Sequence, residues 1–478
     1  MKAHPPHASL RYPQVIPEAW KALEGVVSLE TDIDKAGAHD VTPSSVHLGV
    51  CLPALAYGAC LATGEEQPPT VTFLAFSWWT KIYLLSFRSG LRLVARIPRE
   101  SEQNGLPGGD RSGYLRQRME SEVATLCYLR CFKPEFPSPG VWAWNSDANN
   151  AAGVPYLLVD YLEGETLEVV WRDNVADRSR ILDDLALHYS KLANPLPFSS
   201  FGMIKFRSQD TSAGSSSRRT YPELLQAEDF VIGPYLSEPQ YSNAPRGEGA
   251  ELPRYAASSV EQLWRDLWKT EAARTDWNDW KEDQEVTDEE VRRASTLVLE
   301  LISSHRLPDE LVKPCLVIGD FAWRNIICDP LTKRIVGFID LQGMSVMPRF
   351  GLARYPEDIS TYSATESWVT STGGFRWVPP SSVDQATTIP IGGEMGLDGL
   401  AELREEVIDH LRFRQEFRLR LKKHHPNLND KFWEASELPL KIMFLLVHGL
   451  PEWVTHITWL ARELELAVPN QGSFIHVP

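Results

Sequence analysis

Residues 316–343 read LVIGDFAWRNIICDPLTKRIVGFIDLQG and contain three short apolar runs that are separated by Gly, Asp and Pro. Runs of this length and composition predict strand, tight loop, strand, turn and strand. Each run delivers a polar residue to a strand end: Asp320, Asn325 and Asp340. We expect a short hairpin to bring these three side chains to one edge of a sheet, where they can converge on a ligand.

This spacing suits phosphoryl transfer. A transferred phosphoryl group carries spread negative charge, so a protein that transfers it holds Mg²⁺ against the phosphates and orients the attacking hydroxyl. Asp320 can accept the hydroxyl proton, Asn325 can bind the metal, and Asp340 can bridge metal ions. These residues alone leave an alternative to a phosphoryl-transfer site, in which the three polar residues simply end strands at the surface, as Asp and Asn commonly do in turns.

The order D-x-x-x-x-N followed by I-D resembles the catalytic segment of the aminoglycoside phosphotransferase family, within the protein-kinase-like fold. The resemblance implies that Asp320 is the catalytic base and that Asn325 and Asp340 are ligands of Mg²⁺. The family usually has His two residues before the Asp, where this chain has Ile318. That His braces the catalytic loop more than it takes part in the chemistry, so its replacement bears on activity rather than on fold.

A second match lies in residues 94–98, VARIP, and 121–125, SEVAT. Many fungal-type members of the family have VARIP at this strand. The resemblance implies that Arg96 stands where the fold has its phosphate-binding Lys, and that Glu122 pairs with it. Arg offers a planar fork that holds a carboxylate or a phosphate through two hydrogen bonds. Without the resemblance, an edge-strand Arg in solvent and an exposed helix Glu are the simpler interpretation.

The first hairpin, expected within residues 70–98, departs from the family. In a kinase-like fold this hairpin covers the phosphates with a glycine-rich loop, because only Gly lets the backbone N–H groups approach phosphate closely. The corresponding turn, residues 76–80, reads FSWWT and contains no glycine. The resemblance places Ser77 at the nucleotide, while Trp78 and Trp79 could stack on a base or pack in the core.

Residues 155–171, PYLLVDYLEGETLEVVW, resemble the hinge of the family, where an apolar strand passes behind the adenine. The resemblance implies that the backbone of Asp160, Tyr161 and Leu162 makes the hydrogen bonds to the adenine. A turn at Glu163 and Gly164 and a Thr-led helix follow. Strand, turn and helix therefore occur in the expected order.

Composition narrows the class of partner. The 478 residues carry a formal net charge of -16, which argues against nucleic acid or an anionic membrane surface as the main partner. The longest apolar run falls short of the roughly 20 residues that a membrane span needs. The six cysteines form no C-x-x-C pair and the chain starts without a signal-like segment, so we expect reduced thiols and a cytoplasmic protein. Zinc-protease, Walker, nucleophile-elbow and dinucleotide motifs are absent.

Together these matches imply an α+β, bilobal, protein-kinase-like fold. We expect an N-terminal extension at 1–67, an antiparallel-sheet N-lobe with one helix at 68–163, and a mostly helical C-lobe with acceptor-binding helices at 164–478. Residues 208–220 and 349–391 are expected to be mobile loops. The implied function is transfer of phosphate from ATP, with Mg²⁺, to a hydroxyl of a small molecule. The alternative is a catalytically weak pseudokinase that binds nucleotide or acts as a scaffold.

Overall fold

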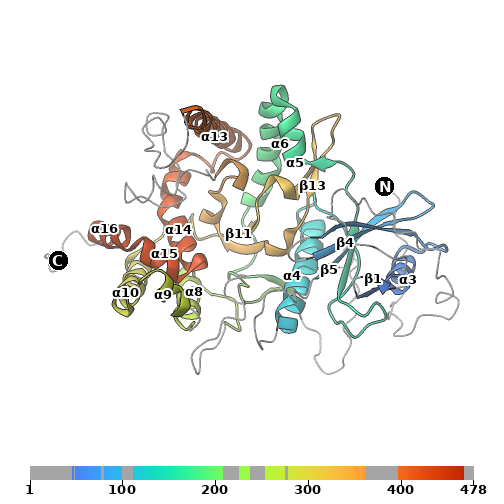
Figure 1. The fold of residues 1–478 in the computed structure, drawn as a ribbon, viewed down its shortest axis with the longest axis horizontal. Coiled ribbons are helices and arrows are strands. Elements are labelled where there is room, and N and C mark those ends of the chain that lie inside the picture. Colours follow the sequence, from blue (N-terminus) through green and yellow to red (C-terminus); the bar gives the residue numbers. More distant parts are fainter. Residues whose placement is uncertain are drawn as a thin grey trace. The chain divides into compact units, whose positions relative to one another are not determined.

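The computed structural model of the chain describes residues 46–47, 49–76, 80–98, 111–207, 225–236, 253–274, 278–360 and 397–467 (Figure 1). These residues fall into two compact units. Unit 1 takes its residues from Met1–Gly164, Ile204–Val231 and Val336–Gln342. Unit 2 takes its residues from Glu165–Met203, Ile232–Ile335 and Gly343–Pro478.

Unit 1 is built on an antiparallel sheet of five strands in the order β3-β4-β5-β7-β6. The strands are β3 (Thr70–Phe76), β4 (Thr80–Ser86), β5 (Arg92–Pro98), β6 (Val141–Asn145) and β7 (Tyr156–Asp160). The turn at Ser89 and Gly90 joins β4 to β5. Gly90 has φ +87°, which glycine adopts without steric cost, and its N–H donates to the carbonyl of Phe87.

One face of this sheet packs against helix α3 (Leu52–Thr63), which follows the short strands β1 (Val46–His47) and β2 (Val50–Cys51). Alternate residues of β5 enter this core together with residues of the helix: Leu52, Leu55, Leu93, Ala95 and Ile97. Because side chains alternate along a strand, Arg96 lies on the opposite face of the sheet. The alternation in VARIP therefore separates the core-forming residues from the candidate functional one.

Helix α4 (Arg111–Phe132) buries one face within unit 1. Four residues on this face are at most 6% exposed: Met119, Val123, Leu126 and Cys127. Glu122 belongs to the buried residues of the same helix. A carboxylate in such a place needs a charged or hydrogen-bonding partner.

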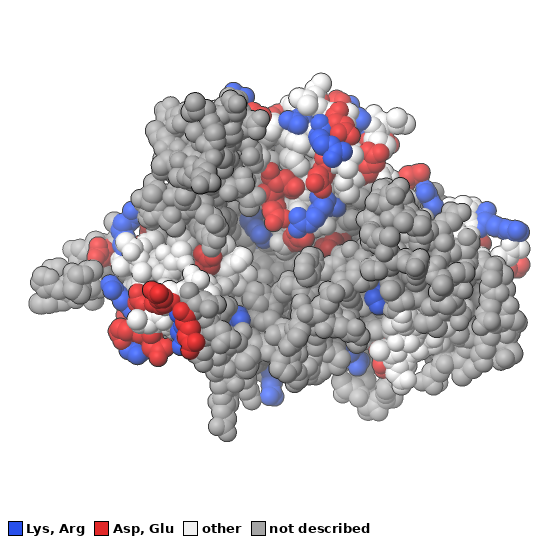
Figure 2. All heavy atoms as spheres, viewed as in Figure 1, with Lys and Arg blue, Asp and Glu red and all other residues white. Residues whose placement is uncertain are grey.

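Unit 2 is mostly helical. Its helices are α5 (Leu167–Asp173), α6 (Arg178–Ser190), α8 (Val260–Ala272), α9 (Asn278–Asp283), α10 (Asp288–Ser304), α13 (Leu397–His424), α14 (Asp430–His448), α15 (Leu450–Thr455) and α16 (Ile457–Ala467). Helix α10 starts with a capping box in which Thr287 and Glu290 bond to each other's backbone N–H. The acidic first turn of α10 contributes to the red cluster at the lower left of Figure 2. No helix within the described ranges is both long and apolar enough to cross a membrane.

Short strands of unit 2 frame the predicted catalytic segment. Strand β11 (Pro314–Val317) pairs with β14 (Ser345–Pro348), and β12 (Ile326–Cys328) pairs with β8 (Glu165–Thr166). Strand β13 (Ile335–Phe338) then takes the chain from unit 2 back to unit 1. The predicted order of strand, loop, strand, turn and strand in residues 316–343 is therefore confirmed. The α+β part of the predicted fold class is confirmed as well, with an antiparallel sheet in one unit and mostly helices in the other.

The compact units differ from the lobe boundaries predicted at 67 and 163. Helix α3, which lies within the predicted extension, is part of the core of unit 1. Residues 204–231 and 336–342 also join unit 1, although the prediction placed them in the C-lobe. Packing explains the second difference, because Phe338 of β13 stacks on Phe136 with 4.7 Å between ring centroids.

Of the two segments predicted to be mobile loops, 208–220 and 349–391, the structure describes only residues 349–360. Residues 208–220 and 361–391 lie outside the described residues. Residues 349–360 form the turns η8 (Arg349–Leu352) and η9 (Glu357–Ile359) and bury Phe350 and Ile359, and their mobility stays a prediction. The Gly and Pro residues here mark turns in a packed segment, and composition alone does not distinguish these from turns in a mobile one.

Candidate active site

The loop after β11 carries Asp320 and passes close to Gly343 in unit 2. A Cβ atom on Gly319 would lie 2.6 Å from the carbonyl oxygen of Gly343, so a residue with a side chain does not fit here without a backbone shift. Glycine therefore lets two backbone segments approach each other directly beside Asp320.

Asp320 and Asn325 lie side by side in unit 2. The turn η6 (Trp323–Asn325) directs the amide of Asn325 back toward the start of the loop. Its nitrogen donates to Oδ2 of Asp320 at 2.9 Å and to the Asp320 carbonyl at 3.2 Å. The Asp320 side chain is 43% exposed, whereas Asn325 is 9% exposed. The buried amide thus steadies a carboxylate that solvent and ligands can reach.

This arrangement leaves an oxygen for a cation. Because the amide nitrogen of Asn325 faces Asp320, the amide oxygen is the atom left for a hard cation such as Mg²⁺. Within the described part of the chain, no three His, Cys, Asp or Glu side chains gather closely enough to hold a metal ion. Mg²⁺ usually keeps several waters and binds one or two carboxylates together with substrate phosphates. The donor types available therefore fit Mg²⁺ that arrives with a nucleotide.

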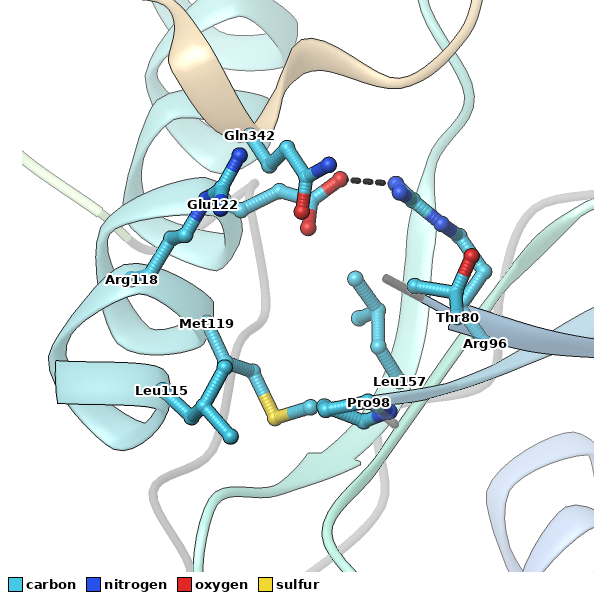
Figure 3. Close-up of a pocket in the computed structure, with 9 residues that line it drawn as sticks. All are labelled: Thr80, Arg96, Pro98, Leu115, Arg118, Met119, Glu122, Leu157 and Gln342. Carbon is cyan, nitrogen blue, oxygen red and sulfur yellow. Dashed lines mark hydrogen bonds and ion pairs between the residues drawn. The ribbon is translucent and has the colours of Figure 1, made fainter. Parts of the chain in front are cut away.

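In unit 1, Arg96 bridges two carboxylates. One terminal nitrogen donates to Oε1 of Glu122 on α4, which Figure 3 shows, and the other donates to Oδ1 of Asp340 at 2.5 Å. The side chains of Arg96, Glu122 and Asp340 are 12%, 7% and 32% exposed. A solvated edge-strand Arg and an exposed helix Glu are therefore excluded, and Arg96 and Glu122 pair as the resemblance implies.

Burial and charge oppose each other in this cluster. Burial raises the pKa of Glu122, and the nearby charge of Arg96 offsets only part of that effect. Burial alone lowers the pKa of Arg96, but the charges of Glu122 and Asp340 outweigh it and raise the pKa above the usual Arg value. The guanidinium therefore stays charged at any physiological pH.

Arg96 and Glu122 also line a hollow in unit 1 (Figure 3). Its polar side adds Thr80, Arg118 and Gln342, and its apolar side consists of Pro98, Leu115, Met119 and Leu157. The polar groups of this hollow come from four places in the sequence: the start of β4, strand β5, helix α4 and the loop after β13. The guanidinium, hydroxyl and amide N–H groups among them can donate hydrogen bonds to an anionic ligand.

Asp340 has an uncommon backbone conformation. Its φ is +55°, in the left-handed region that residues other than glycine rarely adopt. Asp is among the residues that tolerate it best, and such strain is concentrated at active sites and ligand clamps. The observed outlier supports a functional role for Asp340.

The predicted hinge residues lie at the end of β7. The carboxylate of Asp160 accepts hydrogen bonds from the N–H of Gly140 and the indole N–H of Trp142, both at 2.7 Å. The N–H of Asp160 donates to the Gly140 carbonyl at 3.0 Å, and the N–H of Tyr161 donates to the Arg92 carbonyl at 3.3 Å. A contact from Asp160 or Tyr161 to an adenine would therefore need a backbone atom other than the N–H.

Two further residues were predicted at the nucleotide. Leu162 is half-buried, and its side chain lies so close to Gly337 that a Cβ atom there would be 2.6 Å from Leu162 Cδ1. Ser77 lies outside the described residues, as do Trp78 and Trp79. The contact predicted for Ser77 therefore stays a prediction.

A comparison with known families decides which family the chain represents. The phosphotransferase enzyme family matches residues 82–350, more than half of the chain. The chain belongs to this family. The matched residues run from β4 to η8 and include the described members of the predicted site: Arg96, Glu122, Asp160, Tyr161, Leu162, Asp320, Asn325 and Asp340.

Individual relatives of this phosphotransferase-family chain are distant. A subtelomeric hrmA-associated cluster protein of Aspergillus fumigatus is 23% identical over 337 residues, which cover 61% of this chain and 61% of the relative. Altered inheritance of mitochondria protein 9 of Clavispora lusitaniae is 24% identical over 313 residues, which cover 60% of this chain and 49% of the relative. The match to this chain therefore spans between 49% and 61% of the length of these relatives.

A solved structure also resembles the chain. The ADP-bound aminoglycoside phosphotransferase APH(2'')-Ib is 12% identical, with 83% of this chain and 99% of that chain covered and a TM-score of 0.35. A likeness at this level supports no conclusion about the activity of this chain.

In this phosphotransferase-family chain, Glu357 and Asp358 hold the loop that carries Asp320, which sequence reasoning did not foresee. The N–H of Trp323 donates to Oδ2 of Asp358 at 2.7 Å, and the N–H of Glu357 donates to the carbonyl of Phe321 at 2.8 Å. A signal was present, because Glu and Asp directly after Pro356 are typical of the start of a helical turn. The Gly/Pro content of the surrounding residues obscured it.

Proposed function

We propose that the chain is an ATP- and Mg²⁺-dependent phosphotransferase that acts on a hydroxyl group of a small molecule. The observation that carries the proposal is the pairing of Asp320 with Asn325, which leaves an exposed carboxylate beside an amide oxygen. Membership of the phosphotransferase enzyme family supports the same reaction class.

Each residue has a proposed task. Asp320 accepts the proton of the acceptor hydroxyl or orients that hydroxyl toward the phosphate. Its 43% exposure gives an acceptor access to the carboxylate. Asn325 and Asp340 hold Mg²⁺, which, when bound, neutralises charge on the phosphates.

Arg96 has a narrower proposed task than the sequence suggested. Both of its terminal nitrogens are engaged, one by Glu122 and one by Asp340. Arg96 therefore steadies the Asp340 carboxylate directly, and a contact with phosphate requires the exchange of one of these bonds. A guanidinium suits this role because its planar fork bonds two acceptors at once.

The net charge of the chain bears on the charge of the acceptor. The net charge of -16 favours a neutral or cationic acceptor over an anionic one, because the field of the whole chain disfavours the approach of anions. The nucleotide, which is itself anionic, would bind with its Mg²⁺ and near Arg96.

A second candidate function is a catalytically weak protein that binds nucleotide or acts as a scaffold. Two observations favour it. Ile318 stands where the family usually has His, and the carboxylate of the proposed metal ligand Asp340 is bonded to Arg96. The two candidates agree on the fold and differ in turnover.

Turnover is the test of the proposed function. Purified chain is mixed with ATP, Mg²⁺ and a panel of hydroxyl compounds, and ADP release is measured. We expect acceptor-dependent ADP release, and we expect Asp320→Ala to lower kcat by roughly 10²–10⁴-fold, the usual contribution of a general base. The control is Asp309→Ala, which changes an exposed Asp of the same unit and should leave kcat unchanged. Equal turnover in wild type and Asp320→Ala would contradict the role of Asp320.

A further inference from the structure

Arg324 links Asp320 to a second carboxylate in unit 2. One of its terminal nitrogens donates to Oδ1 of Asp320 at 2.7 Å, and the other lies 2.9 Å from Oε2 of Glu357. Asn325 already donates to Oδ2 of Asp320. Both oxygens of the candidate catalytic carboxylate are therefore held, each by a different donor.

Glu357 is fixed by its own surroundings. It opens the turn η9, and its N–H donates to the carbonyl of Phe321 at 2.8 Å. The residues on both sides of it also reach the catalytic loop, since Asp358 accepts the N–H of Trp323 and Arg354 donates to the carbonyl of Ile318 at 3.3 Å. The position of Glu357 is thus set by contacts that do not involve Arg324.

We propose that Arg324, held by Glu357, is a positioning residue that fixes the carboxylate of Asp320 for the reaction. The inference rests on the proposed function, because it assumes that Asp320 accepts the acceptor proton. Most family members have a His at the position of Ile318, and that His braces the catalytic loop. Here the contacts from Glu357 through Arg324 to Asp320 take over that role.

The exposed fractions of these three side chains indicate that the contacts position Asp320 rather than stabilise the fold. The side chains of Asp320, Arg324 and Glu357 are 43%, 53% and 51% exposed, and ion pairs as exposed as these contribute little to stability. The geometry of a catalytic group is far more sensitive, since a misplacement of about 1 Å can cost roughly a hundredfold in rate. Loss of the brace should therefore lower turnover and leave the fold intact.

The test compares Glu357→Gln and Arg324→Ala with a matched control. Glu261 on α8 is 51% exposed, as Glu357 is, and it holds Arg265 at 3.0 Å in the same unit. We expect each test variant to lower kcat by roughly 10- to 100-fold. We expect the KM for Mg²⁺-ATP to change by less than about twofold, because Arg324 is proposed to act on Asp320 rather than on the nucleotide. Glu261→Gln should match wild type in both constants.

Two further variants guard against a purely structural effect. Arg324→Lys keeps the charge and should recover part of the lost kcat, and added guanidinium should partly restore Arg324→Ala. The double variant Glu357→Gln/Arg324→Ala should be no slower than Arg324→Ala alone, because both changes break one chain of contacts. Thermal melting checks that every variant is folded, and Glu357→Asp replaces Glu357→Gln if the latter does not fold.

The outcomes distinguish this inference from the proposed function. If wild type turns over, Asp320→Ala does not, and both Glu357→Gln and Arg324→Ala keep the wild-type kcat, the positioning role is overturned and the proposed function stands. If wild type turns over no hydroxyl acceptor, both are overturned. A fall in kcat in the Glu357 and Arg324 variants but not in Glu261→Gln, with guanidinium rescue of Arg324→Ala, supports the inference.

Discussion

Arg96 joins two carboxylates from distant parts of the chain, Glu122 of α4 and Asp340 after β13. A buried ion pair is weak evidence for net stability, because the loss of hydration offsets much of the attraction. Removing one partner is different, because a buried carboxylate is then left without its counter-charge. If Arg96 is removed, most of the lost free energy of unfolding should come from Glu122, because its side chain is 7% exposed and would be left without a counter-charge.

We therefore expect Arg96→Met to lower the free energy of unfolding by about 3–5 kcal/mol, as for other broken buried pairs. The double variant Arg96→Met/Glu122→Leu should recover most of this loss, because no unpaired charge remains buried. Urea denaturation followed by circular dichroism measures both values. The control is Arg172→Met, whose side chain is 70% exposed and which should change stability by no more than about 0.5 kcal/mol. An Arg96→Met variant as stable as this control would contradict the account of the cluster.

Some contacts of the candidate site could be predicted from the sequence, and others could not. Asp320 and Asn325 are five positions apart, and a tight turn between them brings their side chains together whatever the rest of the chain does. The contact between Arg324 and Glu357 spans 33 positions and depends on where η9 packs. No local pattern encodes such a contact.

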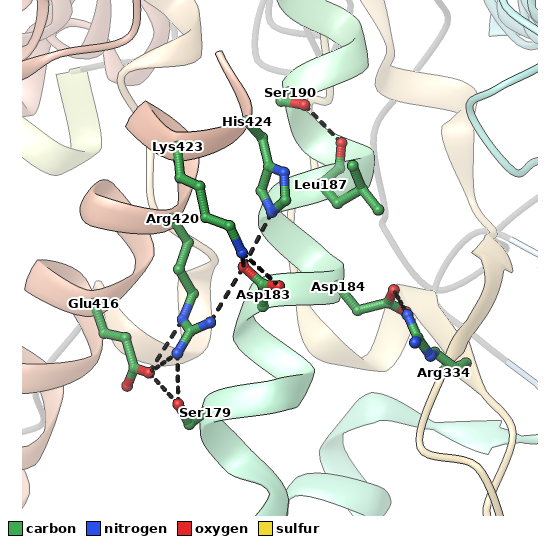
Figure 4. Close-up of polar contacts among 10 residues, drawn as sticks. All are labelled: Ser179, Asp183, Asp184, Leu187, Ser190, Arg334, Glu416, Arg420, Lys423 and His424. Atoms are coloured by element: carbon green, nitrogen blue, oxygen red, sulfur yellow. Dashed lines mark hydrogen bonds and ion pairs between the residues drawn. The ribbon is translucent and has the colours of Figure 1, made fainter. Parts of the chain in front are cut away.

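Among the helices, the C-terminal part of α13 packs on α6 through charged residues (Figure 4). Arg420, Lys423 and His424 lie 3.2, 3.1 and 3.0 Å from Oδ1 of Asp183. Burial raises the pKa of Asp183, but hydrogen bonds from Lys423, His424 and Arg420 outweigh it and lower the pKa to about 2. This basic segment therefore joins two helices of unit 2.

This pKa predicts how stability depends on pH. A carboxyl whose pKa is lowered from 3.8 to about 2 stabilises the fold fully above about pH 4, and this contribution is lost as the pH falls through about 2. Because Asp183 is 30% exposed, solvent screening reduces the contribution to about 1 kcal/mol. We expect Asp183→Asn to be less stable than wild type by about that amount at pH 6, with the difference vanishing toward pH 2.

Urea denaturation of wild type and Asp183→Asn between pH 2 and pH 6 measures this difference. Asp173→Asn serves as the control, because its side chain is 56% exposed and it pairs with the adjacent Arg172. The control should follow wild type across the range. A difference between Asp183→Asn and wild type that is as large at pH 2 as at pH 6 would show that the ion pairs are not its source.

The elements themselves were largely predictable, because periodicity and capping are local. The capping box at Thr287 joins residues three positions apart, and the buried stripe of α8 repeats every three or four residues. The membership of residues 336–342 in unit 1 was not predictable, because it depends on the stacking of Phe338 on Phe136, which lies about 200 positions earlier in the sequence. Packing between remote residues decides such assignments.

For the molecule as a whole, the central claim is that the chain binds Mg²⁺-ATP through Asp320, Asn325 and Asp340. Asp320 and Asn325 belong to unit 2, and Asp340 belongs to unit 1. The proposed function assigns each of these three residues a role toward Mg²⁺-ATP. The family was predictable from three short matches, whereas no motif in the sequence identifies the acceptor.

Isothermal titration of Mg²⁺-ATP into the purified chain tests this claim most directly. The variants are Asn325→Ala and Asp340→Asn, the second of which keeps a hydrogen-bond acceptor for Arg96 and removes the negative charge. Asp309→Ala is the control. We predict that wild type and control bind with the same Kd and that each variant binds at least about tenfold more weakly, a difference of about 1.4 kcal/mol. No binding to wild type at saturating nucleotide, or the same Kd in all four proteins, would contradict the account.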